Sequence, residues 1–303
     1  MKIVYMGTPD YATKILQEIL VQNDIEIVAL FTQPDKPVGR KKILTPPHIK
    51  KYCLDNDIDI PIYQPITLKD ENIVIQLKEY NLDYIVVAAY GQILPQAILD
   101  IAPCINLHAS LLPKYRGASP IQQAILNDDE YTGVTSMMME AGLDSGDILG
   151  YRYVKIDNKD VGKLFEQLSY QASKLTIDTL KNFDLINPIK QNSSRVSYCK
   201  KITKSDGLVE FDNAKMVSIK YRAYKYWPEI YLDSGLKLKE LSFIEEESSN
   251  KKGIILEIAK DYAIVGCEKG SIKIIQVQPK SKKSMKIVDY LRGQRIGVGE
   301  ILL

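Results

Sequence analysis

The chain has 303 residues, of which 45% are hydrophobic and 26% are charged, a composition typical of a globular protein and not of a disordered one. No segment approaches the roughly 20 apolar residues that a membrane helix needs, and the first residues lack the apolar core of a signal peptide. We therefore expect a cytoplasmic protein. Because one hydrophobic core rarely serves a chain of this length, two domains are expected.

The charge is unevenly distributed along the chain. Residues 188–303 carry 22 Lys and Arg against 14 Asp and Glu, which leaves 18 against 24 for residues 1–187. A basic surface that binds a partner is thus expected in the carboxyl-terminal part of the chain.

Metal and disulfide chemistry are not indicated. The four cysteines stand apart without a C-x-x-C pair, and only His48 and His108 could supply imidazole ligands. Such spacing is typical of neither a zinc site nor a disulfide framework, so we expect no metal.

The first part of the chain alternates strand and helix patterns. A strand-like run at 2–6 ends in a glycine turn, and a helical pattern at 12–20 and a second strand at 25–31 follow. This alternation predicts an α/β fold, a Rossmann-like, doubly wound, mainly parallel sheet with helices on both faces. The later elements expected in this domain are strands at 84–89, 104–108 and 134–139 and helices at 73–80, 120–126 and 161–183.

The periodic pattern stops between Gln33 and Pro47, a stretch with four prolines, one glycine and four basic residues. We expect a long polar loop here. Such loops in compact domains are usually functional or disordered, and a plain solvated linker is an equally good interpretation.

The second part of the chain is rich in short strand patterns, at 253–258, 263–267 and 271–277, with helices expected at 214–224 and 285–291. Turn residues separate these runs, which favours a small β-barrel. The predicted organisation is a first domain over 1–187, a linker over 188–206 and a second domain over 207–303.

One predicted strand carries polar side chains on a single face. Alternation along Cys104–Ser110 places Asn106, His108 and Ser110 together, and each of them would cost about 1 to 3 kcal/mol if buried without a partner. They lie near the carboxyl end of the strand, where open α/β sheets bind ligands. A ligand cleft is therefore favoured over the alternative, a core histidine bonded to the backbone.

A glycine-flanked loop at 142–147 presents Asp144 and Asp147, either of which could orient an imidazole; turn capping is the alternative role for both. An amide, an imidazole and a carboxylate suit acyl transfer to an amine. Since Ser110 lacks the G-x-S-x-G elbow and no cysteine neighbours His108, no covalent nucleophile is expected. The Gly7-Thr8-Pro9 turn also lacks a dinucleotide fingerprint.

Several motifs together resemble the folate-dependent formyltransferase family over nearly the whole chain. They are Met6–Asp10, Thr32–Pro37, Val87–Gly91, Ile93–Pro95, Asn106-Leu-His108, Ser110-Leu-Leu-Pro113, Tyr115-Arg-Gly117, Thr132–Thr135, Gly142–Gly146 and, more weakly, Trp227-Pro228. The resemblance implies transfer of a formyl group from 10-formyltetrahydrofolate to the α-amino group of methionine on initiator tRNA, and an OB-like second domain.

The resemblance also implies roles for individual residues. The catalytic residues fall on Asn106, His108 and Asp144, with Asp144 preferred over Asp147. The tRNA acceptor stem is expected to meet Arg40, Lys41 and Lys42. Folate contacts are implied for Ser110, Leu111, Leu112 and Pro113, and pterin contacts for Ala88, Ala89, Tyr90 and Gly91.

The enzyme that the resemblance implies is expected to be a monomer. Two alternatives remain at this point. A family member acting on a sugar nucleotide or another small amine shares the Asn-x-His core, but nothing pairs such an activity with the Arg-Lys-Lys loop and a basic second domain. A non-catalytic RNA-binding protein would have no need of Asn106, His108 and Asp144.

Overall fold

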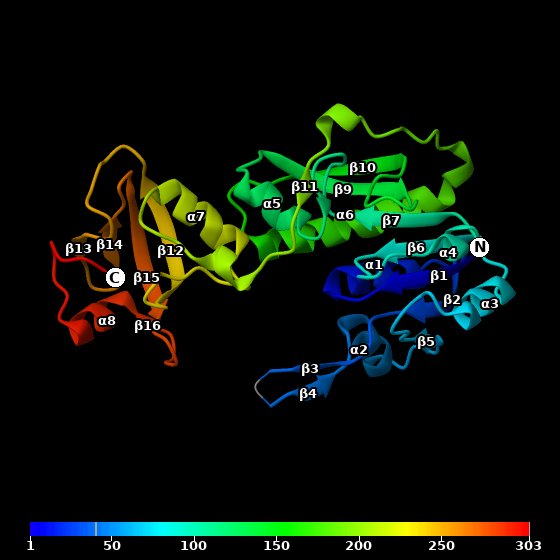
Figure 1. The fold of residues 1–303 in the computed structure, drawn as a ribbon, viewed down its shortest axis with the longest axis horizontal. Coiled ribbons are helices and arrows are strands. Elements are labelled where there is room, and N and C mark those ends of the chain that lie inside the picture. Colours follow the sequence, from blue (N-terminus) through cyan, green and yellow to red (C-terminus); the bar gives the residue numbers. More distant parts are fainter. Residues whose placement is uncertain (40, 303) are drawn as a thin grey trace. The chain divides into compact units, whose positions relative to one another are not determined.

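The computed structural model describes residues 1–39 and 41–302, and the chain divides into two compact units (Figure 1). The first unit comprises Met1–Pro120, Tyr131–Lys155 and Phe165–Cys199; the second comprises Ile121–Glu130, Ile156–Leu164 and Lys200–Leu303. Two short segments that lie inside the predicted first domain, 121–130 and 156–164, thus belong to the second unit.

The first unit is built on a seven-stranded sheet of order β10-β9-β7-β6-β1-β2-β5. Neighbouring strands from β7 to β5 are parallel, whereas β9 runs antiparallel to β7 and β10 antiparallel to β9. The mainly parallel, Rossmann-like sheet is therefore confirmed; β10 and the short β5 were not predicted. The strands are β1 (Lys2–Gly7), β2 (Glu26–Phe31), β5 (Ile62–Tyr63), β6 (Tyr84–Ala88), β7 (Cys104–His108), β9 (Tyr131–Met138) and β10 (Ile148–Lys155).

Helices cover both faces of this sheet. Val4 and Met6 of β1 share one buried cluster with Leu77 and Ile98, which come from α3 and α4. The alternate residue Tyr5 points to the other face, where its hydroxyl donates to the Ala12 carbonyl at 2.8 Å. The helices of this unit are α1 (Asp10–Leu20), α2 (His48–Asp55), α3 (Glu71–Glu79), α4 (Gln96–Leu99), the 3-10 helices η1 (Phe183–Leu185) and η2 (Ser193–Arg195), and, from residue 165 on, α6 (Val161–Lys181).

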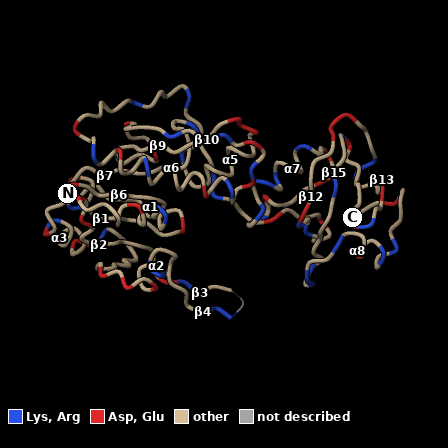
Figure 2. Tube along the Cα trace, turned by 180° about the vertical axis from the view of Figure 1, so that it is seen from behind, with Lys and Arg blue, Asp and Glu red and all other residues tan. Residues whose placement is uncertain are grey.

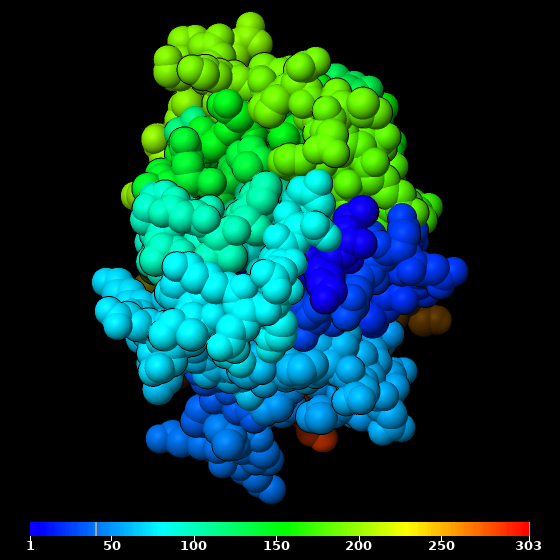
Figure 3. All heavy atoms as spheres, turned by 90° about the vertical axis from the view of Figure 1, so that its right-hand side faces the viewer, coloured from blue at the N-terminus to red at the C-terminus, as the bar shows by residue number. Residues whose placement is uncertain are grey.

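The parallel strands all begin at the end of the sheet where the chain starts, the face shown in Figure 3. There the Lys2 N–H donates to the Asp83 carboxylate at 2.6 Å and the Asp83 N–H donates to the Lys2 carbonyl at 2.9 Å. These bonds attach β1 to the residue before β6. The carboxyl ends of β1, β6 and β7 consequently meet at the opposite end.

The segment predicted as a loop at 33–47 holds a short hairpin, so that prediction was wrong in part. Strands β3 (Lys36–Val38) and β4 (Ile43–Thr45) pair antiparallel. Asp35, at the base of the hairpin, accepts hydrogen bonds from Lys50 at 3.0 Å and from Gln64 at 2.7 Å. Local patterns did not predict this pairing, because each of its strands has only three residues, which is too short for an alternation of apolar and polar positions to be recognised.

The second unit contains an antiparallel sheet of order β12-β15-β14-β13, with β16 paired to β15. The long strand β12 was not predicted, because its charged residues interrupt the apolar alternation. The elements of this unit are β12 (Lys237–Glu245), β13 (Ile255–Ile258), β14 (Ala263–Gly266), β15 (Ser271–Gln278), β16 (Met285–Lys286), α5 (Pro120–Leu126), α7 (Ala214–Ala223), α8 (Ile287–Gln294) and the 3-10 helix η3 (Lys204–Gly207).

The segment expected to be an irregular linker contributes regular structure to the first unit. Strand β11 (Tyr198–Cys199) pairs in parallel with β8 (Arg116–Gly117). Ile189 also forms an antiparallel bridge with Ile148 of β10. Residues 189–199 therefore belong to the first unit and lie next to the loops that follow β7 and β9.

Candidate active site

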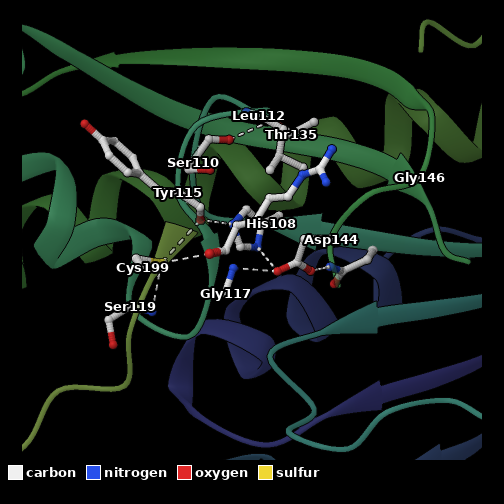
Figure 4. A network of polar contacts seen from close by, with 12 residues as sticks. His108, Ser110, Leu112, Tyr115, Gly117, Ser119, Thr135, Asp144, Gly146 and Cys199 are labelled. Carbon is white, nitrogen blue, oxygen red and sulfur yellow. Dashed lines mark hydrogen bonds and ion pairs between the residues drawn. The ribbon is translucent and has the colours of Figure 1, made fainter. Parts of the chain in front are cut away.

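The three predicted catalytic side chains come together at the carboxyl end of β7. Asn106 and His108 lie on β7 and are only 9% and 7% exposed, and Asp144 lies in the loop after β9 with 15% of its side chain exposed. Oδ2 of Asp144 is 3.7 Å from Nδ1 of His108, and Oδ1 is 3.5 Å from the amide nitrogen of Asn106 (Figure 4). An amide, an imidazole and a carboxylate therefore converge on one point.

The protonation of the imidazole follows from its partners. Nε2 of His108 lies 2.8 Å from the backbone carbonyl of Tyr115. A carbonyl can only accept, so Nε2 carries the proton and in the neutral ring Nδ1 keeps its lone pair. The distance from Nδ1 to Asp144 exceeds that of a hydrogen bond. The Tyr115 carbonyl thus sets the tautomer, a role that the sequence could not assign to a backbone atom.

Asp144 is held by the backbone as well as by side chains. Its Oδ2 accepts the Gly117 N–H at 2.8 Å. Its own backbone lies in the left-handed region, with φ of +47°, which costs of order 1 to 3 kcal/mol for a residue other than glycine. Asp147, the competing candidate, accepts the Met138 N–H with its backbone carbonyl. The carboxylate beside the imidazole is that of Asp144.

The backbone of Tyr115 is also held by its surroundings. It too lies in the left-handed region, with φ of +61°, and its N–H donates to the Ser197 hydroxyl at 3.0 Å. The Cys199 thiol lies 3.3 Å from the Tyr115 carbonyl. Burial, and in addition the Asp144 carboxylate, raise the pKa of that thiol, so it remains protonated and able to donate.

The four predicted folate residues after β7 form a turn that is bonded to its surroundings. The Ser110 hydroxyl donates to the Lys114 carbonyl at 2.6 Å, and the Leu112 N–H donates to the Thr135 hydroxyl at 3.0 Å. Leu112 is buried, Leu111 is partly exposed, and the Pro113 carbonyl accepts the Ser197 N–H. Ser110 therefore points into its own turn and not toward Asp144.

The predicted pterin segment follows β6. Ala88 and Tyr90 are buried, whereas Ala89 and Gly91 are exposed and both have positive φ, +47° and +83°. Burial raises the pKa of Tyr90 to about 12, and its hydroxyl has no hydrogen-bond partner within the described part of the chain. Ala89 and Gly91 are thus the residues of this segment that are accessible at the surface.

Two of the predicted RNA-contacting residues, Lys41 and Lys42, lie between β3 and β4. Lys41 and Lys42 are exposed, and Figure 2 shows the basic positions of this hairpin. Arg40 lies outside the described residues. Val38, Ile43 and Leu44 add exposed apolar side chains, between 56% and 64% accessible.

Sequence reasoning missed the residues that hold the catalytic ones. The sequence predicted no contact from the backbone of Tyr115-Arg-Gly117, although the Tyr115 carbonyl contacts His108 and the Gly117 N–H contacts Asp144. Gln191, which binds the Asp144 loop, lies in the segment taken for a linker. No sequence signal marked it.

Two further observations concern the described part of the chain, residues 1–39 and 41–302. No group of three or more His, Cys, Asp or Glu side chains is arranged there to hold a metal ion. No helix within the same ranges has the length and apolar character needed to cross a membrane.

Sequence comparison places the chain among known proteins. The sequence model described as "Formyl transferase" matches residues 1–180, and the one described as "Formyl transferase, C-terminal domain" matches residues 201–295. The chain is 56% identical to a methionyl-tRNA formyltransferase of a Nitratiruptor species, over 99% of both chains. It is 55% identical to that of Sulfurimonas denitrificans over 100% of both, and 51% identical to that of Helicobacter pylori over 100% of both.

Solved structures share the fold at low sequence identity. An N-formyltransferase from Helicobacter canadensis, crystallised with folinic acid and dTDP-3-aminofucose, gives a TM-score of 0.69 at 19% identity, over 92% of this chain and 100% of that one. HypX from Aquifex aeolicus in complex with tetrahydrofolic acid gives 0.63 at 16% identity, over 98% of this chain and 48% of that one.

Proposed function

The chain belongs to the formyltransferase family and, within it, to the methionyl-tRNA formyltransferases, and from this we propose that it formylates the α-amino group of methionine carried by initiator tRNA. The formyl donor in this proposal is 10-formyltetrahydrofolate. The observation that carries the proposal is the convergence of Asn106, His108 and Asp144 in a chain that matches these relatives from end to end.

The reaction needs a polar site and no covalent bond between the enzyme and the formyl group. The methionine amine attacks the formyl carbon, a C–N bond forms, and the oxygen of the tetrahedral intermediate gains negative charge. The bond from the formyl carbon to N10 of the folate then breaks, and one proton moves from the amine nitrogen to N10. The enzyme must therefore stabilise an oxyanion and carry a proton.

Asn106 is suited to the oxyanion. Its amide carries two N–H donors, and its contact with Asp144 is long, at 3.5 Å. The amide is thus oriented by the carboxylate yet free to donate to the developing oxyanion, an effect typically worth about 3 kcal/mol.

His108 is suited to the proton transfer. Because Nε2 is committed to the Tyr115 carbonyl, Nδ1 is the atom that takes the proton from the amine and returns it to N10. When Nδ1 takes the proton, the ring becomes a cation whose Nδ1 lies 3.7 Å from the Asp144 carboxylate.

The substrates are proposed to meet this centre from two segments. The folate lies against Ala88–Gly91 and the turn Ser110–Pro113; Ala89 and Gly91 are the exposed residues of the first of these segments. The tRNA acceptor stem is bound by Arg40, Lys41 and Lys42, and the basic second domain adds to this binding. We propose that the enzyme is a monomer and acts in the cytoplasm.

An assay with several acceptors tests the function directly. Purified protein and 10-formyltetrahydrofolate are incubated in parallel with charged initiator tRNA, a dTDP-amino sugar and glycinamide ribonucleotide, and formylated product is measured. Formylation of methionyl-tRNA alone is expected. Turnover of the sugar nucleotide in preference to the tRNA would instead favour the sugar N-formyltransferases that share this fold at 19% identity.

A further inference from the structure

The segment that follows the 3-10 helix η1 and ends with β11 is hydrogen-bonded to the rest of the first unit at both of its ends and at two positions between them. We call residues 189–199 the strap. Ile189 exchanges backbone hydrogen bonds with Ile148, at 2.8 and 2.9 Å, and Cys199 pairs with Gly117. Between these two ends, Gln191 and Ser197 reach the residues that contact the imidazole.

Gln191 makes every hydrogen bond that a side-chain amide can make. Its Nε2 donates to the backbone carbonyls of Asp144 at 2.9 Å and Gly146 at 2.8 Å. Its Oε1 accepts from Nε and a terminal nitrogen of Arg116, at 3.0 and 2.7 Å. Since guanidinium groups only donate and carbonyls only accept, the orientation of the amide is unambiguous.

The two residues that contact His108 both need such support. Asp144 and Tyr115 have left-handed backbones, with φ of +47° and +61°. Residues other than glycine keep this conformation only where the surrounding structure holds them in it. The strap supplies that restraint to both: Gln191 binds the Asp144 carbonyl, and the Ser197 hydroxyl accepts the Tyr115 N–H.

We propose that Gln191 is a positioning residue for formyl transfer, which acts by holding the Asp144 loop so that the carboxylate faces Nδ1 of His108 and the Asn106 amide. By binding Arg116 with the same amide, it also sets the spacing between the Asp144 loop and β8, whose Gly117 N–H binds Oδ2. The inference rests on the proposed function and adds a residue to its machinery.

A double-mutant cycle separates positioning from general stability. Gln191→Met keeps the length of the side chain and removes all its hydrogen bonds. In single-turnover formylation of charged initiator tRNA, normalised to the folate-binding stoichiometry, we expect it to lower the rate by at least about 10-fold. In an Asp144→Ala background the same substitution should change the rate by less than about 2-fold, because Gln191 acts through Asp144.

Gln191→Glu shows which of the two contacts matters. A carboxylate still accepts from Arg116 but repels the two carbonyls, so the rate should fall about as far as in Gln191→Met if the Asp144 loop is the target. Gln22→Met is the matched control. Gln22 also donates to a backbone carbonyl, of Glu18, and accepts from a cation, Lys181, but contacts no residue of the site.

The outcomes are distinct. If wild type fails to formylate methionyl-tRNA, the proposed function itself fails. If wild type is active and Gln191→Met lowers the rate equally in both backgrounds, the residue supports folding only and the inference is overturned. Activity of Gln191→Glu near wild type would also overturn it, since the carbonyl contacts would then be dispensable.

Discussion

The backbone carbonyl of Tyr115 accepts a hydrogen bond from Nε2 of His108 at 2.8 Å. In the proposed mechanism this contact leaves Nδ1 as the ring nitrogen that exchanges a proton with the substrate, and Nδ1 lies 3.7 Å from Oδ2 of Asp144. The carbonyl belongs to a residue whose backbone is itself held in the left-handed region. The proposed direction of proton transfer therefore depends on the conformation of this loop as well as on the identity of the side chain.

Replacing the imidazole should remove most of the turnover. We expect His108→Ala to lower kcat by a factor of about 10² to 10⁴, the usual contribution of general acid–base catalysis. Affinity for tRNA, measured by filter binding, should stay within about 2-fold, because the expected phosphate contacts lie on the hairpin. A His108→Ala enzyme with full activity would contradict the proposed mechanism.

Asn106 should matter for the transition state more than for substrate binding. Asn106→Ala removes an oxyanion donor and is expected to lower kcat by about 10² to 10³, with little change in KM for either substrate. Steady-state kinetics with each substrate varied in turn provides the measurement. A rise in KM for folate with unchanged kcat would assign Asn106 to folate binding instead.

Gly117 tests the backbone support of Asp144. Its φ of +116° is unfavourable for other residues, and an added Cβ would lie 2.5 Å from the Cys199 carbonyl oxygen. Gly117→Ala should therefore separate β8 from β11, displace the N–H that binds Asp144, and lower kcat by at least about 10-fold. Gly293→Ala is the control, because a Cβ added there would lie more than 4 Å from every described atom outside its chain neighbours and the adjacent backbone of its own helix. Equal activity of the two variants would show that the β8–β11 pairing is not needed.

The hairpin should act on tRNA alone. Lys41→Ala with Lys42→Ala is expected to weaken tRNA binding and to reduce the slope of log affinity against log salt by about 1 to 2, while folate affinity measured by calorimetry is unchanged. Lys69→Ala with Lys78→Ala removes the same charge elsewhere on the surface and serves as the control. Loss of folate affinity in the hairpin variant would indicate a structural role.

The stabilisation that Asp35 provides at the base of the hairpin should be lost in acid. The hydrogen bond from Gln64, and next that from Lys50, lower the pKa of Asp35 below its ordinary value. A carboxyl whose pKa is lower in the folded state stabilises it above the unfolded pKa of about 4, and this contribution is lost as pH falls through the folded value. Urea unfolding should show wild type more stable than Asp35→Asn at pH 7, with the difference shrinking below about pH 4. A difference that is independent of pH would contradict this account.

Local patterns in the sequence determined the architecture of the first unit and the strand that carries the chemistry. Strand alternation depends only on neighbours along the chain, so the sequence alone predicted that Asn106 and His108 share one face of β7. The alternation of strands and helices likewise predicted the confirmed Rossmann-like sheet. The motifs likewise indicated the family that the comparisons then showed.

Tertiary structure alone decided what holds those side chains. The Tyr115 carbonyl and the Gly117 N–H are backbone atoms, which every residue possesses and no sequence pattern distinguishes. Gln191 lies 47 residues from Asp144 in a polar stretch with the composition of a linker. Its role arises when folding brings the strap beside the catalytic loops, because a hydrogen bond depends on distance in space and not on separation along the chain.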